Sequence, residues 1–185
     1  MRIADLDATD ELLLEKLARL THGAGAVLAP NWLPTMDDAR EEVFDATRAG
    51  HVTRVLLDDD TNPLGWVSIV HAYGAVWEIH PLLVHVEHHR MGHGARLLAD
   101  IESLAASRGA GVLFVSTSDE IGATSLAGRD LYRDPLGALA NIRIDPSHAL
   151  GFWLHMGYTL VGVLPDAEGP GKPSIHLAKR AAEPH

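Results

Sequence analysis

Hydrophobic and polar positions divide the chain into segments with a helical period and segments with a strand period. The strand-like runs are short, rich in β-branched residues and separated by turn residues. They predict strands at residues 2–5, 51–57, 64–72, 76–84, 112–115, 158–164 and 174–179. The helical runs predict a helix that begins after Thr9-Asp10 and ends near Gly23 and Gly25, with further helices at 36–49, 94–108 and 145–156.

The order of these elements, β-α-α-β-β-β-α-β-α-β-β, indicates an α+β fold. Residues 58–63 are turn-forming, so the strands on either side of them should form an antiparallel hairpin. The long helix between the strands at 76–84 and 112–115 allows a parallel pair across it. We therefore expect one domain over residues 1–180, with a mixed, largely antiparallel sheet flanked by helices, and a disordered tail at 181–185.

The stretch from Val76 to Arg108 combines a strand, a glycine-containing loop and an amphipathic helix. Gly92 and Gly94 remove side chains where the chain turns or a ligand approaches the backbone. A helix N-terminus behind such a loop presents N–H groups and a positive dipole end to phosphate, and arginines flank it. The loop lacks the third glycine of a dinucleotide fingerprint and the Gly-Lys-Ser/Thr of a P-loop. An ordinary connection explains the same glycines, so phosphate binding stays a hypothesis here.

Composition narrows the class of protein. The 185 residues carry a formal net charge of −10 and contain no cysteine. The negative charge argues against general nucleic-acid binding and favours a cationic partner, although it also serves solubility. Without cysteine the chain has no disulfide, thiolate nucleophile or cysteine metal site. No segment has the pattern of a membrane span or a signal peptide, so we expect a cytoplasmic protein.

Several motifs resemble those of a known family. The loop at 89–94, His-Arg-Met-Gly-His-Gly, is similar to the acetyl-CoA loop Gln/Arg-x-x-Gly-x-Gly/Ala of the GNAT N-acetyltransferases. Four further stretches are similar to the aminoglycoside 6'-N-acetyltransferases. They are Trp-Glu-Ile-His-Pro-Leu at 77–82, Ser-Leu at 125–126 with Asp-Leu-Tyr at 130–132, Gly-Tyr at 157–158 running into Val-Gly-Val-Leu-Pro at 161–165, and Lys-Pro at 172–173.

This resemblance implies a GNAT-like fold with acetyl-CoA as co-substrate. The amide-rich pantetheine arm would pair with the end of the strand at 82–84, where the backbone N–H of Leu82 would also face the thioester oxygen as an oxyanion donor. The pyrophosphate would lie over the loop and the following helix. The expected CoA contacts are Leu82, Leu83, Val84, His89, Arg90, Met91, Gly92, His93, Gly94, Ala95, Arg96, Phe152 and His155.

Acidic and aromatic residues are the predicted contacts of the acceptor amine. Glu78 is our choice to hold the amine and accept its proton, unless strand alternation leaves it on a solvated face. His80 shares that face and orients Glu78, touches the substrate, or is simply structural. Asp119 is the second predicted substrate carboxylate. Asp130 is a weaker one, within a long connection at 116–145 that we interpret as a functional excursion.

Two aromatic residues, Trp32 and Tyr132, also enter these predictions. Trp32, with Asp37 and Asp38 nearby, would form a pocket wall or would pack between the first two helices. In the connection at 116–145, Asp134 is best explained as part of a solvated loop in which Tyr132 fills the core. A pocket with several carboxylates suits a substrate with several ammonium groups.

Two positions depart from the family pattern. His89 stands where Gln or Arg is usual, which weakens one phosphate contact. Trp153 stands where the family has a tyrosine proposed as general acid, so the CoA thiolate would leave unassisted. We expect no metal, because His85, His88, His89 and His93 match no zinc signature.

The predicted function is acetylation of the 6'-amine of a cationic amino-sugar, an aminoglycoside antibiotic, in a ternary complex with acetyl-CoA. The resemblance also suggests a homodimer and a part in antibiotic resistance. The alternatives are acetylation of a polyamine or a peptide, or a non-catalytic acyl-CoA-binding domain.

Overall fold

The computed structural model describes residues 1–181, and Leu28 through its backbone alone. The helices are α1 (Glu11–Leu28), α2 (Met36–Asp45), α3 (His93–Ser107), α4 (Pro135–Ala140) and α5 (Leu150–His155), with a 3₁₀ turn η1 (Val86–His88). The strands are β1 (Arg2–Asp5), β2 (His51–Leu57), β3 (Pro63–Tyr73), β4 (Val76–Val84), β5 (Val112–Ser118), β6 (Thr159–Leu164) and β7 (Ser174–Arg180). Contacts divide the described chain into two compact units: the first holds 1–27, 33–113 and 180–181, and the second holds 28–32 and 114–179.

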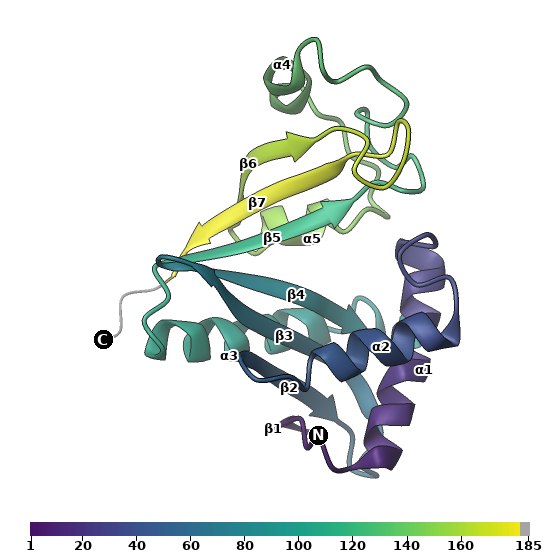
Figure 1. The fold of residues 1–185 in the computed structure, drawn as a ribbon, viewed down its shortest axis with the longest axis vertical. Coiled ribbons are helices and arrows are strands. Elements are labelled where there is room, and N and C mark those ends of the chain that lie inside the picture. The colour runs from purple at the N-terminus through teal and green to yellow at the C-terminus, as the bar shows by residue number, and fades with distance from the viewer. Residues whose placement is uncertain (182–185) are drawn as a thin grey trace. The chain divides into compact units, whose positions relative to one another are not determined.

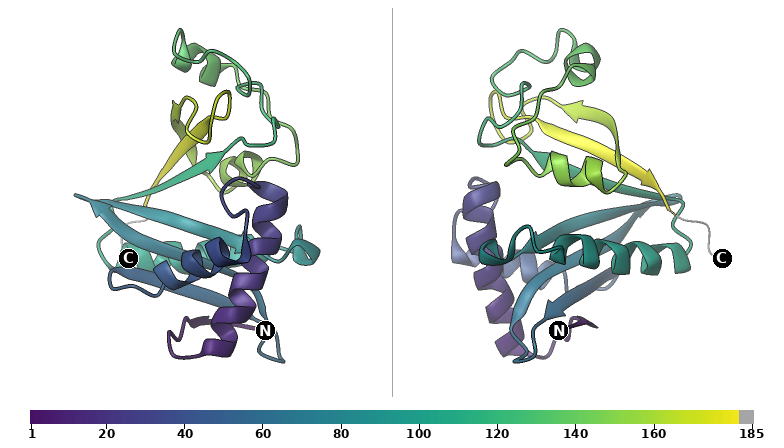
Figure 2. Two further views of the ribbon diagram at one scale, coloured as in Figure 1. Left: turned by 45° about the vertical axis from the view of Figure 1, so that its right-hand side comes forward. Right: turned by 180° about the vertical axis from the view of Figure 1, so that it is seen from behind.

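The first unit is built on four antiparallel strands in the order β1-β2-β3-β4. Helices α1 and α2 cover one face of these strands, and α3 covers the other (Figures 1 and 2). The expected hairpin is confirmed, because β2 and β3 pair from His51↔Val70 onward. The amphipathic face of α3 gives Leu97, Leu98 and Ile101 to the core, all fully buried.

Glycine allows α3 to approach the strands closely. A Cβ at Gly65 of β3 would lie 2.7 Å from the carbonyl oxygen of Leu83 and 3.1 Å from Cδ1 of Leu97. No side chain fits there, so the helix and two strands meet over a bare backbone. On the other face, the Trp66 indole donates to the Thr21 hydroxyl of α1 at 3.0 Å, which satisfies a fully buried N–H.

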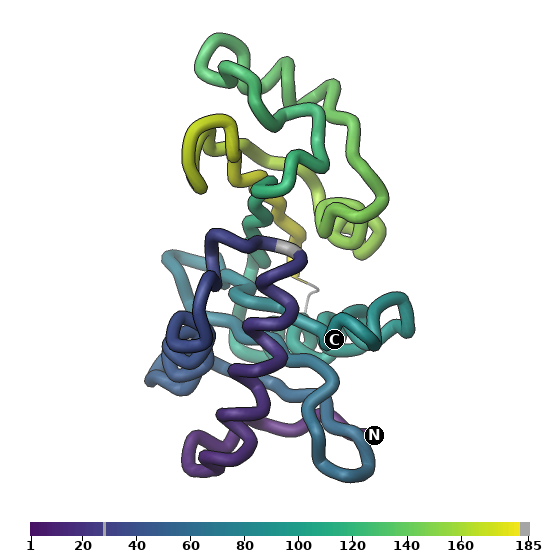
Figure 3. The backbone as a smooth tube through the Cα atoms, turned by 90° about the vertical axis from the view of Figure 1, so that its right-hand side faces the viewer, coloured from purple at the N-terminus to yellow at the C-terminus, as the bar shows by residue number. Residues whose placement is uncertain are grey.

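Helix α1 is longer than the sequence predicted. It begins where expected, with Asp10 accepting from the backbone N–H of Leu13 at 2.9 Å, but continues through Gly23 and Gly25 to Leu28 (Figure 3). The prediction of an end at the glycines was wrong because packing outweighs propensity here. A Cβ at Gly25 would meet Leu33 at 3.0 Å, so this glycine is a contact point within the helix.

Helix α2 is shorter than predicted. Thr35 and Asp38 form a capping box at its start, but it ends at Asp45 rather than near residue 49. Beyond it, the Ala46 carbonyl accepts from the Thr53 hydroxyl at 2.7 Å, which ties the helix end to β2. Gly50, at φ +99°, then makes the turn into the strand.

The second unit contains β5, β7 and β6 in that order, with β6 and β7 antiparallel. Helices α4 and α5 both contact β6. The connection between β5 and α5 is a long excursion from the strands (Figure 3), which contains α4, a helix that the sequence did not predict. The predicted helix from Asp145 begins only at Leu150, because residues 145–149 turn and His148 Nδ1 accepts from the Leu150 N–H at 3.0 Å.

The α+β fold class with largely antiparallel strands is confirmed. The chain is also ordered one residue beyond the predicted domain end: Ala181 is buried and its N–H bonds to the Gly111 carbonyl at 3.1 Å. The remainder of the predicted tail, 182–185, lies outside the described residues. Within residues 1–181, no helix is long and apolar enough to cross a membrane.

Candidate active site

Glu78 lies in the middle of β4, opposite Val70 of β3. Its side chain is half-buried, between exposed and core positions, and the next residue, Ile79, is 2% exposed and points into the core. Among the described residues, none forms a hydrogen bond or an ion pair with the Glu78 carboxylate. A partly desolvated carboxylate without a partner is suited to hold an ammonium group.

A β-bulge begins two residues after Glu78. Ile69 of β3 pairs with Ile79 and Val67 pairs with Leu82, so His80 and Pro81 together lie opposite the single residue Ser68. The bulge separates the half of β4 that carries Glu78 from the half that carries the predicted CoA contacts. Bulges of this kind often re-aim side chains beside active sites.

His80 is the second predicted substrate contact, and it has a partner that the sequence did not reveal. Its Nε2 lies 3.3 Å from Oε1 of Glu42 on α2. Burial lowers the pKa of His80, but the hydrogen bond and charge of Glu42, together with the charge of Glu78, outweigh it and raise the pKa above its usual value. No local pattern in the sequence connects Glu42 with position 80; only the packing of α2 against the strands does.

The end of β4, the predicted thioester site, is mostly buried. Leu83 and Val84 are buried and Leu82 is half-buried, and the three pair with Trp66, Gly65 and Val67 of β3. The His89 side chain contacts the end of β4: its Nε2 lies 2.9 Å from the Val84 carbonyl oxygen. His89 therefore fastens the loop to the strand, a task that the sequence analysis did not assign to it.

The loop before α3, the predicted pyrophosphate site, leads into a helix that has no side-chain cap. Gly92 is the N-cap at φ +82°, no side chain caps the helix, and a Cβ on this glycine would meet nothing within 4 Å. The first N–H groups of a helix have no carbonyl one turn behind them. With His93, Gly94 and Ala95 in the first turn, the backbone offers donors to an anion, and Met91 and Arg96 are exposed at the same end. Arg90, at φ +63°, turns the chain into this loop.

Three histidines gather beside this loop. The ring centroids of His85 and His88 are 5.5 Å apart, and those of His88 and His93 are 6.0 Å apart. Partial burial, and the nearby His88 and Arg96, lower the pKa of His93. In the described part of the chain, no group of three or more His, Cys, Asp or Glu side chains is arranged to hold a metal.

Asp119 lies in the second unit, just after β5, and its carboxylate is engaged by the protein itself. The side chain is 1% exposed and accepts from the N–H of Ala123 at 2.7 Å and from the N–H and hydroxyl of Thr124 at 2.8 and 2.6 Å. His148, whose pKa burial lowers despite the Asp119 charge, lies 4.0 Å away. Asp119 thus holds the following loop through Ala123 and Thr124, an arrangement that we call the Asp119 clamp. Its predicted contact with substrate stays a prediction.

The next residue, Glu120, escaped the sequence analysis. It is 8% exposed, and its Oε2 accepts from the backbone N–H of Asn31. Its Oε1 is buried and has no hydrogen-bond partner among the described residues. A buried carboxylate oxygen without a donor is unfavourable, and such an atom at the end of a strand merits notice. The sequence does not distinguish Glu120 from Asp119, because the two are adjacent acidic residues.

The remaining acidic and aromatic predictions are distributed over the second unit. Asp130 is exposed and forms an ion pair with Arg133 at 2.9 Å. Tyr132 is 71% exposed, so the interpretation that it fills the core was wrong; Leu131, at 3% exposed, does so. Asp134 is exposed, as predicted, and is also the N-cap of α4, accepting from the Gly137 N–H at 2.9 Å.

Trp153, which stands at the position of the family's tyrosine, is a packing residue. Its ring is 5% exposed and lies edge-on between Phe152, at 5.2 Å, and Tyr158, at 5.1 Å. The indole therefore belongs to the core of the second unit. Phe152 is half-buried and His155 is exposed on the last turn of α5, where both remain predicted CoA contacts.

Trp32 is half-buried in the turn at 29–32, so neither a fully packed nor a fully solvated role describes it. The two acidic residues expected near it have other partners. Asp38 accepts from the N–H and hydroxyl of Thr35, and Asp37 pairs with Arg40 at 2.8 Å. Their carboxylates serve α2, and Trp32 remains a predicted wall of the substrate site.

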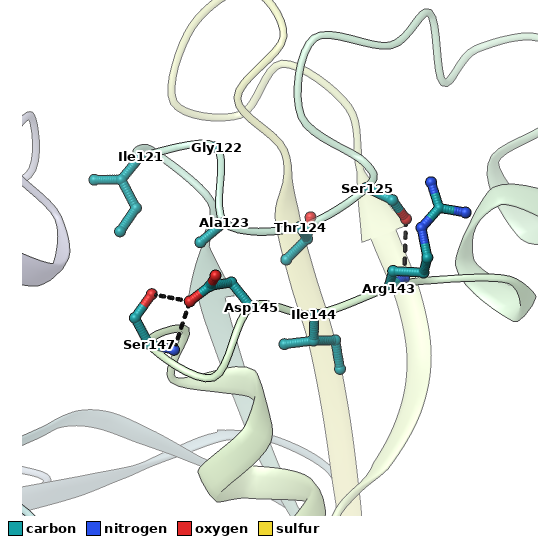
Figure 4. Close-up of a pocket in the computed structure, with 9 residues that line it drawn as sticks. All are labelled: Ile121, Gly122, Ala123, Thr124, Ser125, Arg143, Ile144, Asp145 and Ser147. Carbon is teal, nitrogen blue, oxygen red and sulfur yellow. Dashed lines mark hydrogen bonds between the residues drawn. The ribbon is translucent and has the colours of Figure 1, made fainter.

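An open pocket lies within the excursion of the second unit (Figure 4). Two segments form it, joined by the isolated bridge Thr124↔Ile144 and by the bond from the Arg143 N–H to the Ser125 hydroxyl at 2.9 Å. Asp145 on its rim accepts from the N–H and hydroxyl of Ser147. None of the predicted substrate or CoA contacts lines this pocket. Its lining residues are Ile121, Gly122, Ala123, Thr124, Ser125, Arg143, Ile144, Asp145 and Ser147.

Comparison with known proteins agrees with these features. The profile of the Acetyltransferase (GNAT) family matches residues 22–138, which is more than half of the chain. A search of curated protein sequences finds no match.

Solved structures match the whole chain. An aminoglycoside 6'-N-acetyltransferase complexed with coenzyme A is 28% identical with a TM-score of 0.87, covering 100% of this chain and 99% of that chain. The aminoglycoside 6'-N-acetyltransferase from Enterococcus faecium is 29% identical with a TM-score of 0.85 and the same coverage. Aminoglycoside 6'-acetyltransferase type Ii is 26% identical with a TM-score of 0.74, covering 100% of both chains. The chain belongs to the acetyltransferase (GNAT) family and is an acetyl-CoA-dependent N-acetyltransferase.

Proposed function

We propose that this enzyme transfers the acetyl group of acetyl-CoA to the 6'-amine of an aminoglycoside. The observation that carries the proposal is the half-buried Glu78 carboxylate, which has no hydrogen bond or ion pair among the described residues and lies two residues before His80 on β4. Similarity over the full chain length to several aminoglycoside 6'-acetyltransferases supports this choice of acceptor. The net charge of −10 favours a polycationic substrate through long-range attraction.

The proposed reaction is a direct transfer in a ternary complex. Glu78 holds the acceptor ammonium and takes its proton, directly or through a water molecule. The neutral amine then attacks the thioester carbon, and the backbone N–H of Leu82 donates to the oxygen on which negative charge develops. When the C–S bond breaks, the thiolate leaves and takes a proton from solvent. With acceptor and donor held in line, positioning supplies a large share of the rate.

The site residues of the first unit divide the binding of CoA between them. The backbone of Leu82, Leu83 and Val84 pairs with the pantetheine arm, and the loop over Gly92 with the first turn of α3 holds the pyrophosphate. His89 supports this loop from below through the Val84 carbonyl. In the second unit, Trp32, Asp119 and Asp130 remain proposed acceptor contacts.

A thiol-release assay tests the proposal. The enzyme is incubated with acetyl-CoA and kanamycin, and free CoA is measured with a thiol reagent. The matched control is an amino-sugar of the same ring system with a hydroxyl in place of the 6'-amine. Turnover with kanamycin and none with the control supports acetylation at the 6'-amine. Absence of turnover on every amino-sugar with a free 6'-amine refutes it, and turnover on polyamines or peptides alone would move the assignment to those amines.

Two further proposals follow from the same resemblance. The enzyme forms a homodimer, which light scattering after size-exclusion chromatography measures directly. Expression in a susceptible bacterium raises the inhibitory concentration of kanamycin, and the Glu78→Ala variant does not. An unchanged inhibitory concentration with active enzyme in the cell would separate the chemistry from a role in resistance.

A further inference from the structure

Glu42 occupies a position that its place on a helix does not explain. It lies on α2, and its side chain is 15% exposed, whereas the neighbouring Glu41 is exposed. Its Oε1 approaches His80 Nε2 to 3.3 Å, and the His80 side chain is 48% exposed. The Glu42 carboxylate is therefore largely shielded from water, whereas about half of the His80 side chain is exposed.

The bulge in β4 changes the strand pairing at His80. His80 and Pro81 share one partner position, opposite Ser68, so the regular ladder is interrupted at His80, just after the pair Ile69↔Ile79. Glu78 acts electrostatically on the same imidazole. Two carboxylates therefore act on His80: Glu42 Oε1 lies 3.3 Å from its Nε2, and Glu78, which has no hydrogen bond or ion pair within residues 1–181, acts through its charge.

We propose that Glu42 is a positioning residue for acetyl transfer, which holds His80 through Nε2 so that Nδ1 accepts the proton passed on from the acceptor amine by Glu78. The proposal deepens the proposed function and rests on it for the role of Glu78. A carboxylate at one ring nitrogen fixes the tautomer, since Nε2 keeps its hydrogen and Nδ1 stays the acceptor. It also stabilises the imidazolium once the proton has arrived.

The proton balance of the step is simple. The acceptor ammonium loses one proton to Glu78, and the amine nitrogen uses the freed electron pair to form the C–N bond with the acetyl carbon. When the C–S bond breaks, the CoA thiolate leaves and takes up a proton, and the new amide nitrogen gives its second proton to water. The proton passes from Glu78 to His80 Nδ1, which restores the carboxylate. His80 is exposed enough to release that proton to solvent before the next turnover.

The charges around His80 agree with this role. From α2 the titratable group that faces it is Glu42, and from its own strand it is Glu78. The partner strand β3 contributes the uncharged Ser68, whose hydroxyl lies 3.3 Å from His51 Nδ1 of β2. The charges of Glu42 and Glu78 both act on the imidazole, and with the hydrogen bond of Glu42 they outweigh burial and raise its pKa.

A purely structural pair would look the same in a static structure. A Glu42–His80 contact also ties α2 to β4, and its loss would lower stability. That role predicts a change in Tm and leaves the pH dependence of catalysis alone. A positioning role predicts a change in the pH profile, because the acidic limb of kcat/KM reports ionisations of the free enzyme.

The test compares Glu42→Gln with the matched control Glu41→Gln. Each variant removes one negative charge from α2 without changing the length of the side chain, and Glu41 is exposed with no part in the site. With an acceptor that the wild type acetylates, kcat/KM is measured from pH 5.5 to pH 9, together with the KM for acetyl-CoA and the Tm. We expect Glu42→Gln to lower kcat/KM by about tenfold or more, as loss of an orienting partner of a histidine commonly does. Its acidic limb moves to lower pH, because the charge that raises the pKa of His80 is gone; the KM for acetyl-CoA stays unchanged.

Two further variants keep the test decisive. Glu42→Asp retains the charge but shortens the reach, so it should lower kcat while the acidic limb stays near that of the wild type. In a His80→Gln background, Glu42→Gln should cost almost nothing more, because both residues act through one imidazole. If the losses of kcat/KM from Glu42→Gln and His80→Gln were instead fully additive, the two residues would act separately.

The outcomes divide cleanly. An unshifted acidic limb and a kcat/KM like that of Glu41→Gln would overturn the proposal, and so would a lower Tm as the sole effect of Glu42→Gln. If the wild type acetylates some other amine and no amino-sugar, the proposed function fails, and the same pH profiles on that amine still decide the role of Glu42.

Discussion

Asp119→Asn distinguishes a structural carboxylate from a substrate-binding one. In the structure both carboxylate oxygens are used: one accepts from the Ala123 N–H, and the other accepts from the N–H and the hydroxyl of Thr124. The substitution keeps the size of the side chain and replaces one acceptor with an NH₂ donor. That donor then faces an N–H group in a site that is 1% exposed, where neither finds water.

The expected cost follows from these three bonds. A hydrogen bond to a charged acceptor contributes about 1.5–3 kcal/mol, and a buried donor left without a partner costs about 1–3 kcal/mol. Asparagine preserves the bonds at one oxygen, weakened by the loss of charge, and abolishes those at the other. We therefore expect Asp119→Asn to lower the free energy of unfolding by roughly 2–4 kcal/mol, and Asp119→Ala by more.

Urea unfolding followed by tryptophan fluorescence measures this loss, with Asp130→Asn as the control for an exposed carboxylate of the same unit. Acetylation kinetics are taken at a temperature where each variant is folded. A loss below about 1 kcal/mol, within the range of ordinary surface changes, together with a large fall in kcat/KM, would refute the structural role of Asp119 and leave substrate binding as its role.

Three further predictions follow from the first unit. Glu78→Ala should lower kcat/KM by more than about tenfold with acetyl-CoA binding nearly intact, measured by kinetics and calorimetry; turnover like that of the wild type would remove Glu78 from the mechanism. Gly65→Ala should destabilise by about 1–3 kcal/mol in urea, because the new methyl group would lie 2.7 Å from the Leu83 carbonyl oxygen, and an unchanged midpoint would contradict this packing. Burial lowers the pKa of His80, yet Glu42 and Glu78 outweigh burial, so the pKa in the folded state is raised. The pair with Glu42 should therefore stabilise the fold fully below the unfolded pKa of about 6.5. This stabilisation should be lost as the pH rises through the higher pKa of the folded state. The Tm difference between wild type and Glu42→Gln should accordingly shrink with rising pH, and a difference that grows would reverse the sign of the argument.

Periodic segments were predictable because their pattern is local. The strand from Val76 to Val84 and the helix after Gly92 were read from residues that are neighbours in sequence, and the structure confirms both. The boundaries that failed depend on distant contacts. Gly25 ended the predicted helix on propensity, whereas Leu33 packed against it allows α1 to continue. Helix α4 is six residues long, too short for a period to emerge.

Residue types of the site were easier to predict than side-chain partners. Glu78 and the glycine loop were found from motif and spacing. That His89 bonds to the Val84 carbonyl, or that Asp119 is enclosed by the loop it holds, depends on where each side chain turns, which spacing does not specify. Glu42 is the clearest case: 38 positions separate it from His80, and only the tertiary fold brings the two within 3.3 Å.

The clamp by Asp119 has a consequence for how this enzyme can diverge. It grips the loop largely through the backbone N–H groups of Ala123 and Thr124, which every residue except proline possesses. The side chains of Ile121 and Ala123 can therefore be substituted during evolution without loss of the hydrogen bonds from Ala123 and Thr124 to Asp119. Substitutions at these positions should therefore alter the surface of the loop at little cost in stability.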